Sequence, residues 1–520
     1  MNLPSARNLA FLFHAAPAIV LCTALAACGA DRDGVLEIAI VGGRDATLSD
    51  TRGLTAAGGM IRAATHDGLV SFDAEGLIQP GLAERWIVTD DGLSYIFRLG
   101  ERPGPRGTDT ERARDAEAVA DALRKAIAAQ DGTAFGLDLA IIDEVVARTC
   151  RVIEIRLTAP NPEFLNLMAQ PQLSLADISA TDKGLSLDEK RDMLVLDGAR
   201  RLAEDGTEEQ ARPLNLLIAE PERAVAIFQA GRANVMLGGA IDALPHVELG
   251  GLLQGAIRLD PVDGLFGLSM ARREDGFLSL SANREALAMA IDRNGLILPF
   301  GIAGGWVPTT RLVAPGLPGD TGMVTERWDG LAFEERQAVA AGQVARWRAS
   351  GQPRPAVSVA LPPGRGGEIL FERLRSDLAN VGIALRMADD ADADLRLIDE
   401  VADYDRADWY LNRFNCTVTD ALCSEEADAL VASARTEPDP AIRALLLANA
   451  EALLSAQNVF VPFGPPVRFS LVRGGLEGFA VNRWGCTPCR RCRAAPVNTH
   501  DRRSPRSAPW SARRREAHAL

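Results

Sequence analysis

The chain has 520 residues and a formal net charge of −14, with 47% hydrophobic and 24% charged residues. This length exceeds that of one ordinary domain, so two or three domains are expected. The hydrophobic and charged fractions are typical of a globular protein. The negative charge gives no general case for nucleic-acid binding, so no nucleic-acid partner is expected.

The first segment, 1–28, has the pattern of a lipoprotein signal peptide. An apolar run, 9–27, is broken by His14 and Pro17 and ends in the lipobox-like string LAAC at Cys28. Cys28 is therefore the expected lipid-attachment residue, and its acyl chains would hold the mature protein at a membrane surface. An ordinary secretory signal is the alternative. A transmembrane anchor fits less well, because the run is short and interrupted.

A first strand is expected at 35–41, followed by a two-glycine turn that leads to Arg44 and Asp45. The segment 63–100 then reads as three short strands separated by turns. A turn with glycine ends the first of these strands at Gly76, and the string Asp-Asp-Gly before 93–99 is a hairpin signal.

The remaining elements alternate between strands and helices, which indicates an α/β fold. Strands are expected at 145–157, 214–218, 234–238, 265–270, 356–361, 383–387, 459–462 and 468–472, and helices at 114–129, 221–231, 284–293, 441–457 and after Gly364. The glycines of 364–367 could also form an anion-binding helix start. They lack the Lys-Ser/Thr of a Walker motif, so turn glycines are the preferred interpretation.

The string GLVSFDAEGLIQPGLAERWIVTDDGLSYIFRL, 68–99, resembles the signature of the family 5 extracytoplasmic solute-binding proteins. These are the dipeptide, oligopeptide and nickel receptors of ABC importers. The helix REALAMAIDR, 284–293, is similar to a second motif of that family. The chain departs from the family before the helix at 114–129, where 103–107 reads PGPRG in place of a Trp-x-Asp-Gly element.

The resemblance implies an α/β, two-lobed periplasmic-binding-protein fold of class II, of the large peptide-binding type with an extra subdomain in the first lobe. The expected parts are the first-lobe core at 29–66 and 170–262, rejoined by 469–485, the extra subdomain at 67–169, the second lobe at 263–468, and a basic tail outside the family pattern at 486–520.

The same resemblance supplies ligand-binding candidates from cleft loops and the crossover strand. They are Arg44, Asp45, Phe266, Ser269, Trp306, Trp409, Arg413, Phe414 and Asn415. For Arg44 the alternative is a plain turn, and for Trp409 it is core packing. Peptide-binding members often carry an Asp near this Trp for the α-ammonium of the ligand. Here Asn415 is nearest, and Arg413 beside it favours an anionic or neutral ligand.

Cysteine use fits an exported protein. Cys416 and Cys423 flank a loop-like segment and are expected to form a disulfide, with two free thiols as the alternative. Cys150 ends an apparent buried strand and is expected to be a small core residue.

The tail 486–520 changes composition abruptly, with dense Arg and scattered Pro and Ser. Cys486, Cys489 and Cys492 have zinc-ligand spacing, and His500 could be a fourth ligand. Relatives often end in a sequence like NRWGWHPL, and deleting one base from a GC-rich coding string for WHPLPPLP gives CTPCRRCR, the string printed here. We therefore interpret the tail as out-of-frame or disordered and expect no metal site. A basic membrane-binding tail is the alternative.

The expected function is that of a substrate-binding lipoprotein of an ABC importer. It would be a periplasmic, lipid-anchored monomer without cofactor that captures peptides or similar polar solutes by hinge closure. It would then deliver them to a permease and its ATPase. A sensor or chaperone without an importer is the alternative. Catalysis is disfavoured, because neither His66 nor His246 lies in an HExxH motif and no GxSxG string occurs.

Overall fold

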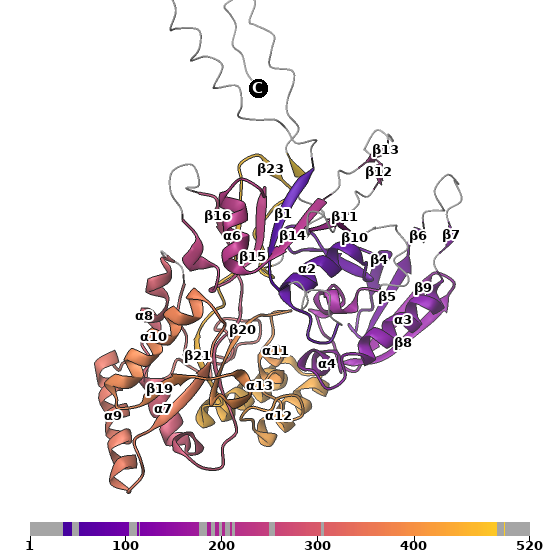
Figure 1. Cartoon of the computed structure of the whole chain (residues 1–520). Coiled ribbons are helices and arrows are strands. Elements are labelled where there is room, and N and C mark those ends of the chain that lie inside the picture. The colour runs from indigo at the N-terminus through magenta and orange to yellow at the C-terminus, as the bar shows by residue number, and fades with distance from the viewer. Residues whose placement is uncertain are drawn as a thin grey trace, which may run out of the picture.

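The computed structural model describes most of the chain (Figure 1). The described residues are 35–43, 51–102, 112–113, 115–175, 185–188, 193–196, 200–202, 208–210, 214–248, 255–302, 306–485 and 493–494.

The elements have the following bounds. The strands are β1 (Leu36–Val41), β2 (Val70–Phe72), β3 (Ile78–Pro80), β4 (Ala83–Val88), β5 (Ser94–Leu99), β6 (Glu101–Arg102), β7 (Arg112–Ala113), β8 (Ile142–Thr149), β9 (Val152–Leu157), β10 (Leu185–Asp188), β11 (Met193–Leu196), β12 (Arg200–Leu202), β13 (Glu208–Gln210), β14 (Leu214–Ala219), β15 (Val235–Gly239), β16 (Ile257–Leu259), β17 (Gly264–Met270), β18 (Ala356–Ala360), β19 (Ala384–Met387), β20 (Leu395–Val401), β21 (Phe460–Gly464), β22 (Phe469–Val472), β23 (Leu476–Glu477) and β24 (Arg493–Ala494). The helices are α2 (Ala56–Thr65), α3 (Ala116–Ala128), α4 (Ala134–Leu139), α5 (Phe164–Met168), α6 (Pro221–Gln229), α7 (Ser281–Ala290), α8 (Arg293–Ile297), α9 (Phe333–Ala349), α10 (Arg365–Asn380), α11 (Ala407–Asn412), α12 (Glu425–Thr436) and α13 (Pro440–Gln457), with short 3-10 turns η1 (Pro171–Leu173), η2 (Leu244–His246), η4 (Phe277–Ser279), η5 (Leu298–Phe300) and η6 (Asp390–Asp392).

The largest sheet has seven strands in the order β10-β11-β14-β1-β15-β22-β16. Its centre is parallel, with Ile38 of β1 paired to Leu216 on one side and Val235 on the other. β1 is buried on both faces: Ile38 packs in the core under α2, and Ala39 packs in the core under α6. Burial on both faces explains why β1 reads as a continuous apolar run rather than an alternating one.

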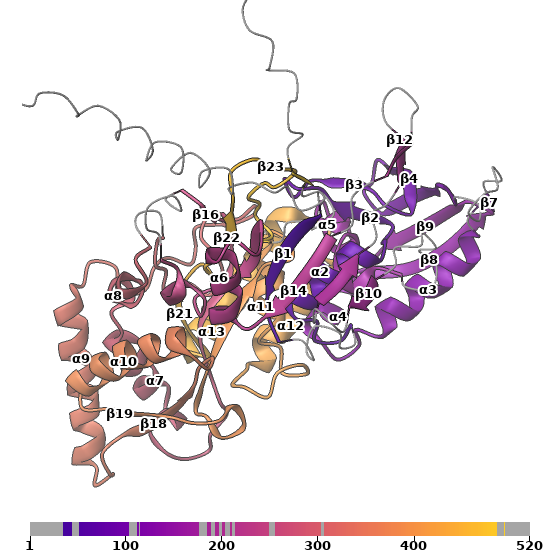
Figure 2. The same cartoon turned by 45° about the horizontal axis from the view of Figure 1, so that its top comes forward.

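A second sheet has five strands in the order β19-β18-β20-β17-β21. β17 lies between β20 and β21 and is antiparallel to both, with Phe266 opposite Asp399. Figure 2 shows α7, α9 and α10 gathered around this sheet at one end of the molecule. The apolar stripe of α10, which includes Leu370 and Leu374, belongs to the same core as Phe266.

A third, antiparallel sheet has the order β4-β5-β9-β8 and is covered by α3. The carboxylate of Asp115 caps α3 by accepting a hydrogen bond from the Glu117 N–H at 3.0 Å. The strand expected at 145–157 is in fact the hairpin β8–β9. Cys150 lies exposed at its tip, so the expectation of a buried core cysteine is wrong. A turn interrupts the apolar run and points this side chain to solvent.

The third sheet shares one apolar core with helices that lie far along the chain. Phe97 and Ile155 from the sheet belong to the same cluster of buried side chains as Trp409 of α11 and Leu447 of α13. Both views place α4 beside α11 and α12 (Figures 1 and 2). The third sheet is therefore packed against the part of the chain that follows β20.

Two short segments connect the seven-stranded and five-stranded sheets, namely 260–263 between β16 and β17, and 465–468 between β21 and β22. The Asp260 N–H donates to the Arg468 carbonyl at 2.9 Å, so the two crossing segments lie side by side. The domain boundaries expected from the sequence stay a prediction. Within the described residues, no helix is long and apolar enough to cross a membrane.

Candidate ligand-binding site

The two large sheets contact each other through a close approach at the N-terminus of α10. A Cβ on Gly366 would lie 2.6 Å from the Asp242 Cα and from the Ile241 carbonyl oxygen. Glycine is needed here because a side chain would collide with the backbone of the opposite lobe. The structure therefore brings the loop after β15 into direct contact with the start of α10.

Carboxylates gather where the lobes meet, near the end of β20. Arg468 Nη1 donates to Asp399 at 2.7 Å, so these two charges compensate each other. Asp242, from the loop after β15, has a buried oxygen without a hydrogen-bond partner in the structure. Burial, and then repulsion from Asp399, raises the pKa of Asp242 above its ordinary value. Glu400 is 54% exposed and is a further charge at this junction.

Arg413 follows α11 and is held by carboxylates from two parts of the chain. Its Nη1 donates to Asp138 at 2.8 Å, and its Nη2 donates to Asp403 at 3.0 Å. A third carboxylate, that of Glu400, lies 3.7 Å from its Nε. The guanidinium also stacks over Trp409, with 3.9 Å from Cζ to the ring centroid.

Asp138 of α4 is fully buried and receives further hydrogen bonds from the second lobe. Asn412 Nδ2 donates to it at 2.7 Å, and the Tyr404 hydroxyl donates at 3.1 Å. Burial raises the pKa of Asp138 to about 6, against the opposing effect of Arg413. The network joins α4 to α11, whose residues are more than 250 positions apart in sequence.

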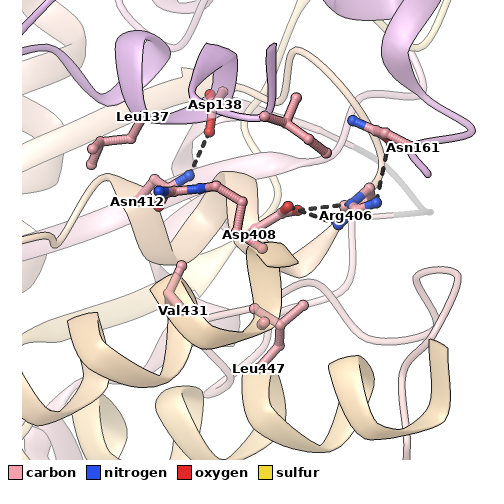
Figure 3. A pocket seen from close by; sticks show the side chains of 11 residues that line it. Leu137, Asp138, Asn161, Arg406, Asp408, Asn412, Val431 and Leu447 are labelled. Atoms are coloured by element: carbon pink, nitrogen blue, oxygen red, sulfur yellow. Dashed lines mark hydrogen bonds and ion pairs between the residues drawn. The ribbon is translucent and has the colours of Figure 1, made fainter. Parts of the chain in front are cut away.

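A small pocket opens beside Asp138 (Figure 3). Arg406 Nη2 donates to Asp408 at 2.9 Å, and its Nη1 donates to Asn161 at 3.3 Å. The Asn412 side-chain oxygen is buried without a hydrogen-bond partner. The pocket can hold a water molecule or a small polar group at this position. It is lined by Leu137, Asp138, Ile141, Asn161, Arg406, Asp408, Asn412, Val431, Ala434, Arg435 and Leu447.

Three aromatic candidates from the sequence lie in the apolar core. Phe266 packs edge-on against Phe463, with 5.5 Å between ring centroids, and is 1% exposed. Trp409 is fully buried, and its indole N–H donates to Asp403. Phe414 is buried against Phe460. These positions agree with the core-packing alternative kept for Trp409, because all three rings are buried in this structure.

The other described candidates make polar contacts within the protein. The Ser269 hydroxyl is buried and donates to a backbone carbonyl. The Trp306 indole N–H donates to the Pro465 carbonyl at 2.9 Å, which places this ring on the second crossing segment. Asn415 accepts hydrogen bonds from Thr417 in the next turn.

The candidates Arg44 and Asp45 lie outside the described residues, as do the lipidation residue Cys28 and the signal sequence. The tail 486–520 is also outside them, apart from β24. Across the described parts of the chain, no group of three His, Cys, Asp or Glu residues is placed to hold a metal ion.

The expectation of an anionic or neutral ligand required Arg413 to be available to it. The contacts with Asp138, Asp403 and Glu400 instead use the guanidinium within the protein. The physical basis for that expectation is therefore removed.

Cys416 and Cys423 form a disulfide, with 5.3 Å between their Cα atoms. The loop that they close is fixed to α12, because the Cys416 N–H donates to Asp428 at 2.9 Å.

Sequence reasoning missed Asp138, Asp242 and Glu400. Asp138 follows a weak helical pattern, and Asp242 lies in a short turn shortly after the glycine pair Gly238-Gly239. Glu400 stands at the end of a strand, where a polar residue also marks an ordinary strand end. The sequence signal that could have found this region is the cluster of acidic residues from 399 to 405.

Known proteins resemble this chain over most of its length. No protein-family model matches it. A curated relative from Pseudomonas aeruginosa, a probable di/tripeptide-binding protein 5, is 23% identical over 489 residues, which cover 80% of this chain and 87% of the relative.

Two solved structures share the fold. Haemophilus influenzae OppA in complex with the peptide RPPGFSPFR has a TM-score of 0.71 at 18% identity, covering 88% of this chain and 99% of that one. The Escherichia coli murein tripeptide binding protein MppA has a TM-score of 0.72 at 17% identity, covering 88% and 98%. The two-lobed α/β fold expected from the sequence is thereby confirmed, because both structures are similar to this chain over most of their length.

Proposed function

We propose that the protein captures peptides, or similar small polar solutes, between its two lobes and delivers them to an ABC permease and its ATPase. The observation that carries this proposal is the pair of large sheets joined by two short crossing segments, 260–263 and 465–468. A rotation about such crossings opens the space between the lobes, and a ligand that contacts both lobes favours closure. The likeness to a di/tripeptide-binding protein along 80% of the chain supports peptides as the solute.

The charges at the junction favour a cationic group on the ligand. Arg413 and Arg468 are paired within the protein, whereas Asp242 has an oxygen without a partner and Glu400 is half exposed. Asp242 and Glu400 share Asp399 and Arg468 as electrostatic neighbours, so they flank one region from opposite lobes. The α-ammonium of a peptide placed there would compensate both carboxylates and link the lobes.

Titration of di- and tripeptides into the purified protein tests this assignment. Glu400→Gln is expected to weaken the binding of peptides with a free N-terminus about tenfold, since a charge-assisted hydrogen bond is lost. N-acetylated peptides should bind weakly to both proteins. The matched control is Glu426→Gln, on the exposed side of α12, which should leave both affinities unchanged. Equal affinities of the wild-type protein for free and acetylated peptides would contradict the role of Glu400.

The proposed location is the periplasm, with a lipid anchor on Cys28. The motif at the end of the apolar run supports it. Metabolic labelling with radioactive palmitate in the native host should mark the wild-type protein and not Cys28→Ala. Unchanged labelling of the variant would rule out this attachment residue.

The protein is further proposed to release its ligand chemically unchanged, so that binding is stoichiometric. Mass spectrometry of a peptide incubated with the protein separates this from catalysis: a shortened or altered peptide would show an enzyme. A sensor or chaperone role is the alternative, and it predicts binding in cells without any peptide uptake that depends on this protein.

A further inference from the structure

The long described stretch 306–485 ends in Asn482 to Gly485, which cross the point where the lobes are joined. We call these four residues the C-terminal clasp. They follow β22, which belongs to the seven-stranded sheet, and β23, which pairs with β24, and the chain returns from there to the crossing segments. Each of the four residues has a distinct contact, and together the contacts reach the crossing segments, the β2–β3 turn and the second lobe.

Asn482 attaches the clasp to the first crossing segment. It is 2% exposed, and its N–H donates to the Asp260 carboxylate at 3.0 Å. Its side-chain amide donates to the Ala74 carbonyl in the β2–β3 turn at 3.2 Å. The backbone N–H of Asp260 also donates a hydrogen bond to the Arg468 carbonyl of the second crossing segment. Asn482 therefore fixes the clasp to both crossing segments.

Trp484 attaches the clasp to the β2–β3 turn. Its indole N–H donates to the Gly76 carbonyl at 2.8 Å, and its ring lies 5.5 Å from that of Phe72 between centroids. Gly76 has φ +79, and a Cβ there would lie 2.8 Å from the Trp484 ring. Gly485 closes the clasp over both crossings, because a Cβ on it would lie 3.1 to 3.3 Å from side-chain atoms of Arg468 and Val262.

Arg483 contacts a residue that lies beyond the two crossing segments. Its Nη1 lies 2.5 Å from the Asp405 carboxylate, which belongs to the second lobe after β20. Asp405 is 6% exposed, and the carboxylates of Glu163 and Asp263 act on it from neighbouring segments. Burial raises the pKa of Asp405, and Arg483 opposes that effect. The buried acid therefore depends on a cation supplied by the clasp.

We propose that the C-terminal clasp is a latch that restrains opening of the lobes. Arg483–Asp405 is the contact of the clasp that must break, in addition to the Asp138–Arg413 contact that also joins the two sides. Rotation of the second lobe about the two crossing segments would separate Asp405 from Arg483. The contacts of Asn482 and Trp484 would remain. The inference rests on the proposed function, because it assigns a control to the hinge that captures the ligand. The latch keeps a share of the ligand-free protein closed and so raises the apparent affinity.

Small-angle X-ray scattering of the full-length protein without ligand tests the latch. Arg483→Gln and Asp405→Asn should each increase the radius of gyration and raise the open-to-closed ratio up to about fivefold, because the Arg483 side chain is 51% exposed and such an ion pair contributes about 1 kcal/mol at most. The double variant should shift no further than either single variant, because both break one contact. Arg483→Lys should restore most of the compaction. The matched control is Arg375→Gln, which removes an exposed ion pair within α10 and should change nothing.

Two outcomes would overturn the proposal. One is a wild-type protein that is already fully open without ligand. The other is an unchanged radius of gyration for Arg483→Gln accompanied by a lower melting temperature, which would make Arg483 a structural anchor. Trp484→Phe keeps a six-membered aromatic ring but loses the indole N–H and part of the ring volume, so it should lower the melting temperature without opening the lobes. Because the scattering is measured without ligand, failure of the latch and failure of the peptide assignment give different results.

Discussion

The Asp138 carboxylate and the Arg413 guanidinium meet at 2.8 Å, although Asp138 lies in α4 beside the third sheet and Arg413 directly follows α11. Both side chains are buried, at 0% and 10% exposure. A buried ion pair is costly to form, but removing one partner leaves the other charge without compensation. The packing between α4 and the chain after α11 is therefore sensitive to substitution of either residue.

Arg413→Met is expected to lower the free energy of unfolding by about 3 to 5 kcal/mol, because Asp138 then lies buried without its guanidinium. Chemical denaturation measures the loss. The double variant Asp138→Asn with Arg413→Met should recover part of it, since both charges are gone. A loss in the double variant equal to the sum of the single losses would contradict a direct coupling.

The same pair predicts a dependence of stability on pH. Burial raises the pKa of Asp138 from 3.8 to about 6, so the folded protein binds a proton that the unfolded chain releases. Its contribution to stability is full below the unfolded pKa and is lost as the pH rises through the folded pKa. Relative to Asp138→Asn, the wild-type protein should gain stability when the pH falls from about 7 to about 4. Melting curves of both proteins check this, and parallel pH profiles would contradict it.

Phe266 provides a test of core packing against ligand contact. Phe266→Ala is expected to cost about 3 to 5 kcal/mol of stability, because the ring is buried against Phe463 and its loss leaves a cavity. Phe266→Leu should cost less. The peptide affinity of the folded fraction should stay unchanged in both variants. A variant that keeps its full stability but loses peptide affinity would instead show that Phe266 contacts the ligand.

The disulfide between Cys416 and Cys423 closes a short loop with a sequence separation of 7. Replacing both cysteines with serine should reduce the free energy of unfolding by about 2 kcal/mol, because a short loop removes limited entropy from the unfolded chain. Mass spectrometry with and without reductant should detect the bond in the wild-type protein. Two reactive thiols in the protein secreted by its host would contradict it.

The sequence predicted the strands that are buried on both faces, and it did so for a physical reason. The run expected at 35–41 is β1 at Leu36–Val41, because a strand covered by helices on both faces must be apolar throughout. The helix expected at 221–231 is α6 at Pro221–Gln229, where proline begins the helix and a turn glycine follows its end.

Local sequence patterns did not predict elements that bury few side chains, or contacts between residues that are distant in sequence. α9 carries charges around most of its surface and buries few side chains, so its sequence lacks a wide apolar stripe and no helix was expected there. The candidate site failed for a different reason. Asp138 and Arg413 are 275 residues apart, and no local pattern can show that two such groups meet. Charge at Arg413 could be read from the sequence, but its neutralisation by three carboxylates could not.

The most direct test of the central claim is native mass spectrometry of the full-length protein purified from its own host. We expect a series of bound masses that differ by amino-acid residues and that are displaced by added peptides with a free N-terminus. A single bound compound that is not a peptide, and that peptides do not displace, would contradict the assignment as a peptide receptor.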